Sequence, residues 1–356
     1  MPAKPSKLPA SPLVLALLAA ALALCCGPSA AEPRLVRFRD GASIGLLGKA
    51  DPFPLYELRL QAPYRLEELL LGTVPAAAKA AAEATPVAAG RAAGGRPFAC
   101  TCFAAGIADD GRVFGRNFDW DLHPALLLFA SPEGGYASVS MVDIAYLGYS
   151  ASSDPFRDPE ALAEAWRIPF DGMNEKGLAV GMMAISRADG ISGEGRPRVG
   201  ELGIMRILLD RAASVDEALA LMGEYDIELE DPPIHYFLAD RGGGAAVVEF
   251  LDGKEVVHRS EKPWMVSTNF LFADVPPQRR FAACGRFARA SARLEAVGGE
   301  LGKDGAFALL EETSQPSTRW SAVYDLEALG VELALGGDFR SPLRRSLDHS
   351  PPAARR

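Results

Sequence analysis

Residues 100–120 read CTCFAAGIADDGRVFGRNFDW, and this stretch decides the fold. A mostly apolar run is followed by the turn signal Asp109-Asp110-Gly111 and then by a second apolar run. This order is typical of a β-hairpin, whose two ends lie side by side. The pattern therefore predicts that Cys100 lies close to Arg116 and Asp119, although both follow it much later in the chain.

A thiol, a guanidinium and a carboxylate form a chemically useful group. A cysteine is a good nucleophile only as its thiolate, and a nearby cation lowers the pKa of the thiol. Arg116 carries a permanent charge, and Asp119 can orient the arginine or accept a hydrogen bond from a backbone or amine N–H. On these residues alone, the alternative is a small buried cysteine on a sheet whose surface carries an Arg/Asp pair.

The motif Gly115-Arg116-Asn117-Phe118-Asp119 gives a second line of inference. It matches the GRN-x-D motif of the choloylglycine hydrolase and penicillin V acylase family, a branch of the N-terminal nucleophile hydrolases, which this stretch resembles. Acid ceramidases and N-acylethanolamine amidases are similar here as well. The spacing selects Cys100 as the nucleophile, because Cys102 lies two positions too close to the arginine. The resemblance covers about residues 100–330.

The resemblance also implies a fold. Composition and periodicity indicate only a mixed α+β domain, whereas the family has a four-layer α/β/β/α sandwich, with two stacked, mostly antiparallel sheets between helices. The hydrophobic patterns predict helices at residues 199–224 and 281–297. They predict strands at residues 137–144, 178–185, 235–240, 245–250, 264–269 and 320–326.

Composition excludes several classes of protein. The chain has 356 residues, of which 49% are hydrophobic, so it can bury a sizeable core. A net charge of -9 argues against nucleic acid or an anionic membrane surface as a partner. Five cysteines are too few for a disulfide scaffold. We expect no cofactor and no metal.

Residues 1–31 have the pattern of a secretory signal peptide. A basic start precedes an unbroken Leu/Ala/Val run at residues 13–24, and Ser29-Ala30-Ala31 is a small-x-small cleavage site. The alternative is a lipoprotein signal that ends at Cys25, where lipidation would anchor the protein to a membrane. In both cases we expect the protein to work outside the cytoplasm, in the periplasm or as a secreted protein.

Residues 32–99 are interpreted as a pro-segment with a linker. A strand is predicted at residues 55–60 and a short helix at 64–71. Residues 75–95 are mostly alanine with Gly and Pro interruptions, which is typical of a linker that a cut can remove. The alternative for part of this stretch is an Ala-rich helix at residues 76–84.

The main domain is predicted at residues 100–340, followed by a disordered tail at 341–356 that is rich in Arg, Ser and Pro. A cut between Ala99 and Cys100 would expose the α-amine of the cysteine. Such an amine has an ordinary pKa of about 8, so near neutral pH it can accept the thiol proton. One residue would then supply both nucleophile and base, and no histidine is needed.

Two neighbours of the predicted nucleophile have alternative readings. Trp120 is the best candidate for the wall of an apolar acyl pocket, while core packing is the alternative. Cys102 shares a strand face with Cys100 and would lie near the site. The alternative for Cys102 is a small buried hydrophobic residue.

The resemblance supplies two further site residues. It gives Asn269, in the sequence Thr268-Asn269, the role of an oxyanion donor, and the alternative is an asparagine in a turn. Arg280, which precedes a phenylalanine, resembles an arginine that supports the cysteine, with Arg279 as the other candidate. A second oxyanion asparagine of the bile-salt hydrolases falls on Ala184, which has no donor side chain. This departure argues against bile-salt or penicillin specificity.

These inferences predict an amidohydrolase with an N-terminal cysteine nucleophile exposed by autoproteolysis before Cys100. Its substrate would be a small N-acylated molecule with a linear amide bond, and nucleic acid is not expected as a partner. One alternative is an acyltransferase, in which an amine takes the acyl group. Another is a non-catalytic envelope protein that has kept the fold. The oligomeric state stays open.

Overall fold

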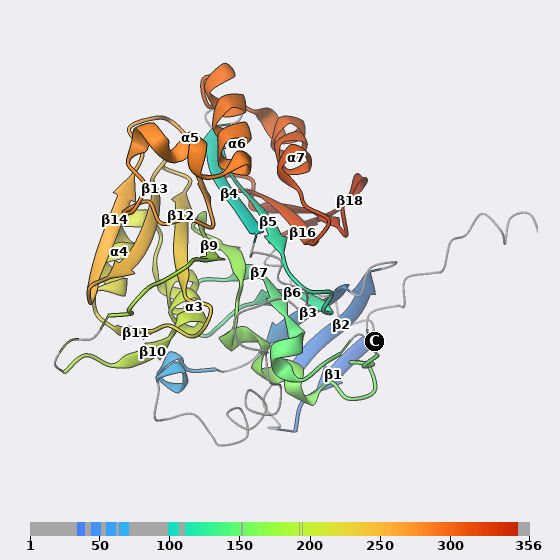
Figure 1. Cartoon of the computed structure of the whole chain (residues 1–356). Coiled ribbons are helices and arrows are strands. Elements are labelled where there is room, and N and C mark those ends of the chain that lie inside the picture. The colour runs from blue at the N-terminus through green and yellow to red at the C-terminus, as the bar shows by residue number, and fades with distance from the viewer. Residues whose placement is uncertain are drawn as a thin grey trace, which may run out of the picture.

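A computed structural model describes residues 34–39, 44–50, 55–61, 64–70, 99–106, 111–150, 152–191, 193 and 195–347. Two large β-sheets form the centre of the molecule, with helices packed around them (Figure 1). The predicted signal peptide, Cys25, and the Ala-rich stretch at residues 75–95 lie outside the described residues. Among the described residues, no helix has the length and apolar character needed to cross a membrane.

The smaller sheet contains the predicted hairpin. Its six strands follow the order β15-β4-β5-β16-β17-β18, and every neighbouring pair is antiparallel. In the hairpin, Cys102 lies opposite Arg116 and Cys100 lies opposite Phe118, while the turn residues 107–110 lie outside the described ranges. The strands are β4 (Ala99–Gly106), β5 (Arg112–Asp119), β15 (Met265–Thr268), β16 (Thr318–Asp325), β17 (Gly330–Leu335) and β18 (Asp338–Ser346).

The larger sheet has ten strands in the order β1-β2-β3-β6-β7-β8-β9-β12-β13-β14. All neighbouring pairs are antiparallel except β3 and β6, which run parallel. The strands are β1 (Arg34–Arg37), β2 (Ile44–Ala50), β3 (Leu55–Gln61), β6 (Ala125–Ala130), β7 (Ser138–Asp143), β8 (Asp171–Asn174), β9 (Leu178–Ala184), β12 (Ile234–Asp240), β13 (Ala245–Leu251) and β14 (Lys254–Arg259).

The two sheets stack face to face, with β4 against β9. Gly181 on β9 makes this close approach possible. A Cβ atom there would lie 2.9 Å from the Phe114 ring and 3.4 Å from Nη1 of Arg116. Helices α3 (Glu201–Arg211) and α4 (Val215–Met222) pack on the larger sheet, and α6 (Gly285–Ala296) and α7 (Gly302–Thr313) pack on the smaller one. The predicted four-layer α/β/β/α sandwich is confirmed (Figure 1).

Short elements connect the main ones. The predicted helix at residues 281–297 is in fact two helices, because Cys284 has extended backbone angles of φ −150° and ψ 125°. Cys284 thus ends α5 (Arg280–Ala283) and precedes α6. The remaining short elements are η1 (Leu66–Leu69), η2 (Ile144–Leu147), η3 (Glu160–Arg167), η4 (Pro277–Arg279), β10 (Arg198–Gly200) and β11 (Asp226–Glu228).

The segment before Cys100 forms part of the larger sheet. Strand β3 pairs with β6 from the Leu55–Ala125 pair to the Leu60–Ala130 pair, and β1 and β2 extend the sheet beyond it (Figure 1, blue strands). Tyr64 stacks on Trp166 with ring centroids 4.0 Å apart. The described part of the predicted pro-segment therefore contributes to the same core as the predicted main domain.

Leu58 tests how much this segment contributes to stability. Its side chain is fully buried on β3, beside Leu128 of β6. Truncation of a buried leucine typically costs about 2–5 kcal/mol. We expect Leu58→Ala to lower the free energy of unfolding by this amount in denaturant titrations of the full chain. Leu35→Ala on β1, where the side chain is 62% exposed, is the matched control and should change it by less than about 0.5 kcal/mol. Equal effects would contradict the packing of β3.

The C-terminal prediction was wrong for part of its range. Residues 341–346 were expected to be disordered, yet they belong to strand β18, which pairs with β17. Leu343 packs against the core and Arg345 pairs with Glu57 on β3, at 2.6 Å between Nε and Oε2. A proline at position 342 is tolerated because β18 is an edge strand. Residues 348–356 lie outside the described residues.

Candidate active site

Cys100 lies at the start of β4 and lines a pocket between the two sheets. Its side chain is 3% exposed, and its thiol is not in a disulfide. The β4–β5 pairing brings it next to the end of β5, as the hairpin pattern predicted. The pocket is lined by Cys100, Phe118, Trp120, Tyr146, Phe170, Met182, Ala184, Glu201, Glu230, Asp231, Pro232 and Ile234.

Arg116 is fully buried beneath the two cysteines of β4. Its Nε lies 2.8 Å from Oδ2 of Asp171, and its Nη1 donates to the carbonyl of Met182 and to Sγ of Cys102 at 3.5 Å. Asp171 itself accepts hydrogen bonds from Trp320 and Tyr324, so the pair is fixed on both sides. Burial raises the pKa of the Cys100 thiol, and the charge of Arg116 acts in the opposite direction. With its pKa raised above the ordinary value, the thiol is protonated near neutral pH.

Asp119 ends β5 with one carboxylate oxygen unpaired. Thr318 donates its hydroxyl to Oδ1, whereas Oδ2 is buried and has no hydrogen-bond partner among the described residues. Burial raises the pKa of Asp119 to about 6. The negative charge of Asp119 acts in the same direction as burial and raises the pKa of the Cys100 thiol. Oδ2 is thus an acceptor available to an additional donor near Cys100.

Asn269 follows β15 and connects both sheets at the site. Its Oδ1 accepts the backbone N–H of Cys100, and its Nδ2 donates to the carbonyl of Ala184 at 2.8 Å. Ala184 therefore takes part through its carbonyl, which accepts a hydrogen bond and does not replace the donor side chain that this position lacks. The side chain of Asn269 contacts the predicted nucleophile directly and is not used only in a turn.

The structure does not bring Arg280 to the cysteine, so this prediction needs a correction. Arg280 donates to the carbonyls of Val275 and Phe272 at 3.2 and 3.4 Å, and its guanidinium lies 4.0 Å from the Phe272 ring centroid. It stabilises the loop before α5 and has no described contact with Cys100. Its neighbour Arg279 is exposed in η4.

Arg286, which the sequence analysis missed, occupies the predicted place. From the first turn of α6 its Nη1 donates to the carbonyl of Cys100 and to Oγ1 of Thr101 at 3.0 Å. Its Nη2 donates to Oδ1 of Asn269 at 3.1 Å. A signal was present, because Arg286-Phe287 repeats the Arg-Phe pair that suggested Arg280. The second pair lies on the buried face of its helix, with Phe287 7% exposed against 52% for Phe281.

Trp120 and Cys102 differ in their position relative to the pocket. Trp120 lines the pocket beside Phe118, with ring centroids 6.2 Å apart, so it is placed where a substrate group can contact it. Cys102 is fully buried and does not line the pocket. Burial raises the pKa of the Cys102 thiol to about 12, which keeps it protonated. Its burial fits the reading as a small core residue, and its Sγ also accepts the hydrogen bond from Arg116.

A buried acid holds the loop that follows Asn269. Glu249 accepts the backbone N–H groups of Phe272 and Ala273 at 2.6 and 3.0 Å. His235 and His258 flank the same carboxylate. Burial raises the pKa of Glu249, but the hydrogen bonds from the two histidines outweigh it and hold this pKa well below its usual range.

No group of three or more His, Cys, Asp or Glu side chains in the described ranges is arranged to hold a metal ion.

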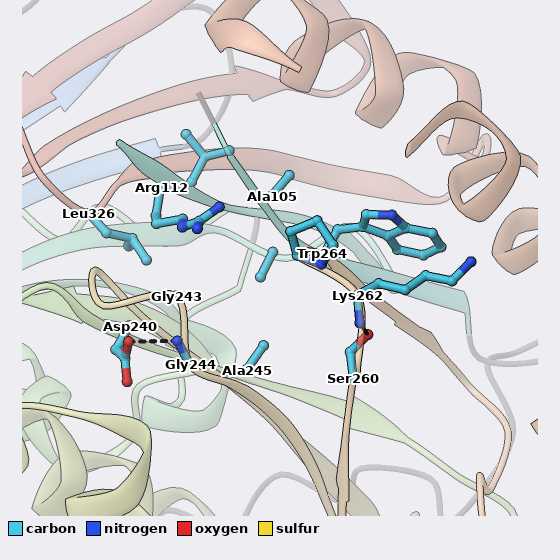
Figure 2. A pocket seen from close by; sticks show the side chains of 13 residues that line it. Ala105, Arg112, Asp240, Gly243, Gly244, Ala245, Ser260, Lys262, Trp264 and Leu326 are labelled. Atoms are coloured by element: carbon cyan, nitrogen blue, oxygen red, sulfur yellow. Dashed lines mark hydrogen bonds between the residues drawn. The ribbon is translucent and has the colours of Figure 1, made fainter. Parts of the chain in front are cut away.

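A second pocket lies at the other end of the β4–β5 hairpin and involves a different set of side chains (Figure 2). Arg112 lies against Gly243 there, and Asp240 accepts the backbone N–H of Gly244 at 2.9 Å. Its lining includes no cysteine, and Ser260 accepts the backbone N–H of Lys262. The predicted nucleophile Cys100 therefore lines the first pocket and not this one.

Comparisons with known proteins bear on the family and the fold. The family model of acyl-coenzyme A:6-aminopenicillanic acid acyl-transferase matches residues 167–278. Penicillin V acylase from Pectobacterium atrosepticum is 25% identical over 284 residues, which are 62% of this chain and 73% of the relative.

Solved structures with a similar fold include two variants of conjugated bile acid hydrolase from Clostridium perfringens. One, with an arginine replaced by leucine, is 16% identical with a TM-score of 0.53, over 70% of this chain and 92% of that chain. The other, with a cysteine replaced by alanine, is also 16% identical with a TM-score of 0.52, over 69% and 92%. The fold they share with this chain is that of the N-terminal nucleophile hydrolases. The family model and the relative support the resemblance of this chain to the choloylglycine hydrolase and penicillin V acylase family of linear amide hydrolases.

Proposed function

We propose that this protein is made as a precursor, and that a cut between Ala99 and Cys100 converts it into an amidohydrolase with an N-terminal cysteine nucleophile. The observation that carries the proposal is the arrangement around Cys100. Its backbone N–H donates to Asn269 and its carbonyl accepts from Arg286, while its free thiol lines the pocket. A cysteine used only for packing needs none of these contacts.

The cut would change the chemistry at Cys100 in a defined way. Hydrolysis of the Ala99–Cys100 peptide bond consumes one water and leaves a carboxylate on Ala99 and an α-amine on Cys100. As an ammonium group, this amine has more donors than the single N–H that Asn269 accepts in the uncut chain. The unpaired Oδ2 of Asp119 is an available acceptor for one of them. As a free amine, it can take the thiol proton.

Amide hydrolysis would then proceed in two steps. The thiolate of Cys100 attacks the substrate carbonyl, and a C–S bond forms. The C–N bond breaks, and the α-ammonium gives its proton to the leaving amine. Water then attacks the thioester, releases the carboxylic acid and restores the thiol. Asn269 can stabilise the oxyanion, because its Nδ2 has two N–H donors and the described residues supply an acceptor for one of them, the carbonyl of Ala184.

Intact mass and N-terminal sequencing of the purified protein test the processing step. We expect one chain that begins at Cys100 and a second, earlier chain that ends at Ala99. Because β3 is paired with β6 and buried, both should elute together from a native sizing column and separate only in denaturant. A single chain that runs through residues 99 and 100, from a preparation that still cleaves amides, would contradict the proposed nucleophile.

An acyltransferase is the second candidate. The observation that favours it is the match of residues 167–278 to a family model described as an acyl-transferase. The first step would be the same, and an amine would replace water in the second. Product analysis in the presence of competing amines separates the two, because only a transferase forms the new amide in preference to the acid. An uncut protein without activity would instead favour the non-catalytic envelope protein.

The location of the enzyme is also part of the proposal. The signal-like pattern of residues 1–31 supports a periplasmic or secreted protein, with Cys25 as the candidate lipid-anchored residue. The substrate we propose is a small N-acylated molecule with an apolar portion, since Phe118, Trp120 and Phe170 line the pocket.

A further inference from the structure

The charged side chains that line the Cys100 pocket are all acidic. Glu201 is the first residue of α3, while Glu230 and Asp231 belong to the loop before β12. Helix α3 and the loop before β12 are in contact at the pocket, because the backbone N–H of Glu230 donates to Oε2 of Glu201 at 3.0 Å. The lining contains neither Lys nor Arg.

The pocket itself, rather than the group of carboxylates, marks the ligand site. Cys100 is only 3% exposed, yet its side chain lines this pocket and is free of any disulfide. The aromatic residues Phe118, Trp120, Tyr146 and Phe170 line the same space. A molecule that reaches the thiol therefore shares the pocket with both the aromatic rings and the carboxylates.

These carboxylates have no counter-charge within the described part of the chain. Neither Glu201 nor the two acids beside it forms an ion pair with a described residue, whereas the nearby Glu228 pairs with Arg198. Burial raises the pKa of Glu201 to about 7; the hydrogen bond from the backbone N–H of Glu230 opposes this rise, and the negative charge of Glu230 adds to it. The wall therefore lacks a cation that would stabilise it in the charged form.

We propose that this pocket selects amides whose pocket-bound end carries an ammonium or similar organic cation, and that Glu201 is the specificity-determining residue. The inference rests on the function proposed above, since it names the substrate class of the same site. A cation is attracted by the carboxylates and by the faces of the aromatic rings. A carboxylate at the same end of a substrate is repelled by the acidic wall, and the lining holds no Lys or Arg side chain to pair with it.

A matched panel of amides tests the proposal on the full, cut protein. Each amide carries a terminal ammonium, hydroxyl or carboxylate group on a chain of fixed length. The panel has two sets of compounds: the terminal group is on the acyl part in the first set and on the amine part in the second. We expect kcat/KM for the ammonium compound to exceed that for the carboxylate compound by at least about tenfold in one set, with the hydroxyl compound between them.

Two variants assign the effect to the pocket. Glu201→Gln should reduce the ammonium-to-carboxylate ratio about fivefold or more. Glu224→Gln is the matched control, because it removes the same charge from an exposed position that does not line the pocket, and it should keep the ratio. Two results would overturn the assignment of Glu201. In one, the wild-type protein has the same kcat/KM for the ammonium and the carboxylate compounds. In the other, Glu224→Gln lowers the ammonium-to-carboxylate ratio as much as Glu201→Gln does.

The outcomes distinguish this inference from the proposed function. Cleavage of the hydroxyl amides without any preference for ammonium would leave the amidohydrolase in place and overturn the substrate class. If no amide is cleaved, calorimetric titration of the Cys100→Ala variant with hexylammonium and with hexanoate decides the inference without catalysis. The inference is supported if the variant binds hexylammonium but not hexanoate, and if adding Glu201→Gln weakens the binding of hexylammonium. Equal binding, or binding of neither compound, overturns it.

Discussion

Replacing Cys100 with alanine is expected to abolish both the cut before residue 100 and amide hydrolysis. The thiol is the only group proposed to form a covalent bond with the substrate, so kcat/KM should fall by at least about 10⁴-fold. The fold should persist, because alanine fits the space of the small cysteine side chain and keeps the backbone N–H that Asn269 accepts. Intact mass measures the cut, and product release from an N-acyl amide measures the hydrolysis.

Cys102 provides the matched control for this experiment. It lies on the same strand and is equally buried, but it does not line the pocket, and its thiol has a pKa of about 12. Cys102→Ala should therefore retain both the cut and the hydrolysis. If Cys102→Ala were inactive while Cys100→Ala kept its activity, Cys102 rather than Cys100 would be the nucleophile. That result would reject the proposal.

Arg286→Ala should give the second largest loss. The guanidinium holds the carbonyl of Cys100, the hydroxyl of Thr101 and Oδ1 of Asn269 from one buried position. Its removal leaves three buried acceptors without this donor and frees the nucleophile and the oxyanion donor to move relative to each other. We expect kcat to fall about 10²- to 10³-fold. KM should change little, because Arg286 does not line the pocket.

The control for this prediction is Arg280→Ala. Arg280 contacts Phe272 and Val275 rather than the cysteine, so its loss should affect thermal stability more than kcat. Arg286→Lys separates charge from geometry, because one ammonium group cannot reproduce the fork that reaches three acceptors. A kcat that falls equally in Arg280→Ala and Arg286→Ala, with the same loss of thermal stability, would show that Arg286 has only a structural role.

Local signals in the sequence predicted most of the site. The hairpin follows from an Asp-Gly turn between apolar runs, and once it forms, its register places Cys100, Arg116 and Asp119 together. Asn269 came from the family motif, and its contact with the backbone of Cys100 agrees with that placement. Trp120 follows the hairpin directly, so its place in the pocket depends on short-range geometry.

The parts that could not be predicted depend on long-range packing. Arg280 and Arg286 each precede a phenylalanine, and only the break of the helix at Cys284 turns the second pair toward the sheet. Strand β18 looked disordered because its polar residues find partners on β17 and β3, far away in the sequence. Glu201 carries no signal of its own, since an acidic residue in the first turn of a helix is common.

The parallel pairing of β3 with β6 affects whether the protein can refold after it has unfolded. In the uncut chain the two strands are joined covalently, so each meets the other at an effective concentration of roughly millimolar. After a cut before Cys100, they meet only at the concentration of the protein itself. The precursor would then refold in dilute solution, whereas the cut enzyme, once unfolded, would not recover its first strands. The lifetime of the mature enzyme would therefore depend on its rate of unfolding rather than on an equilibrium.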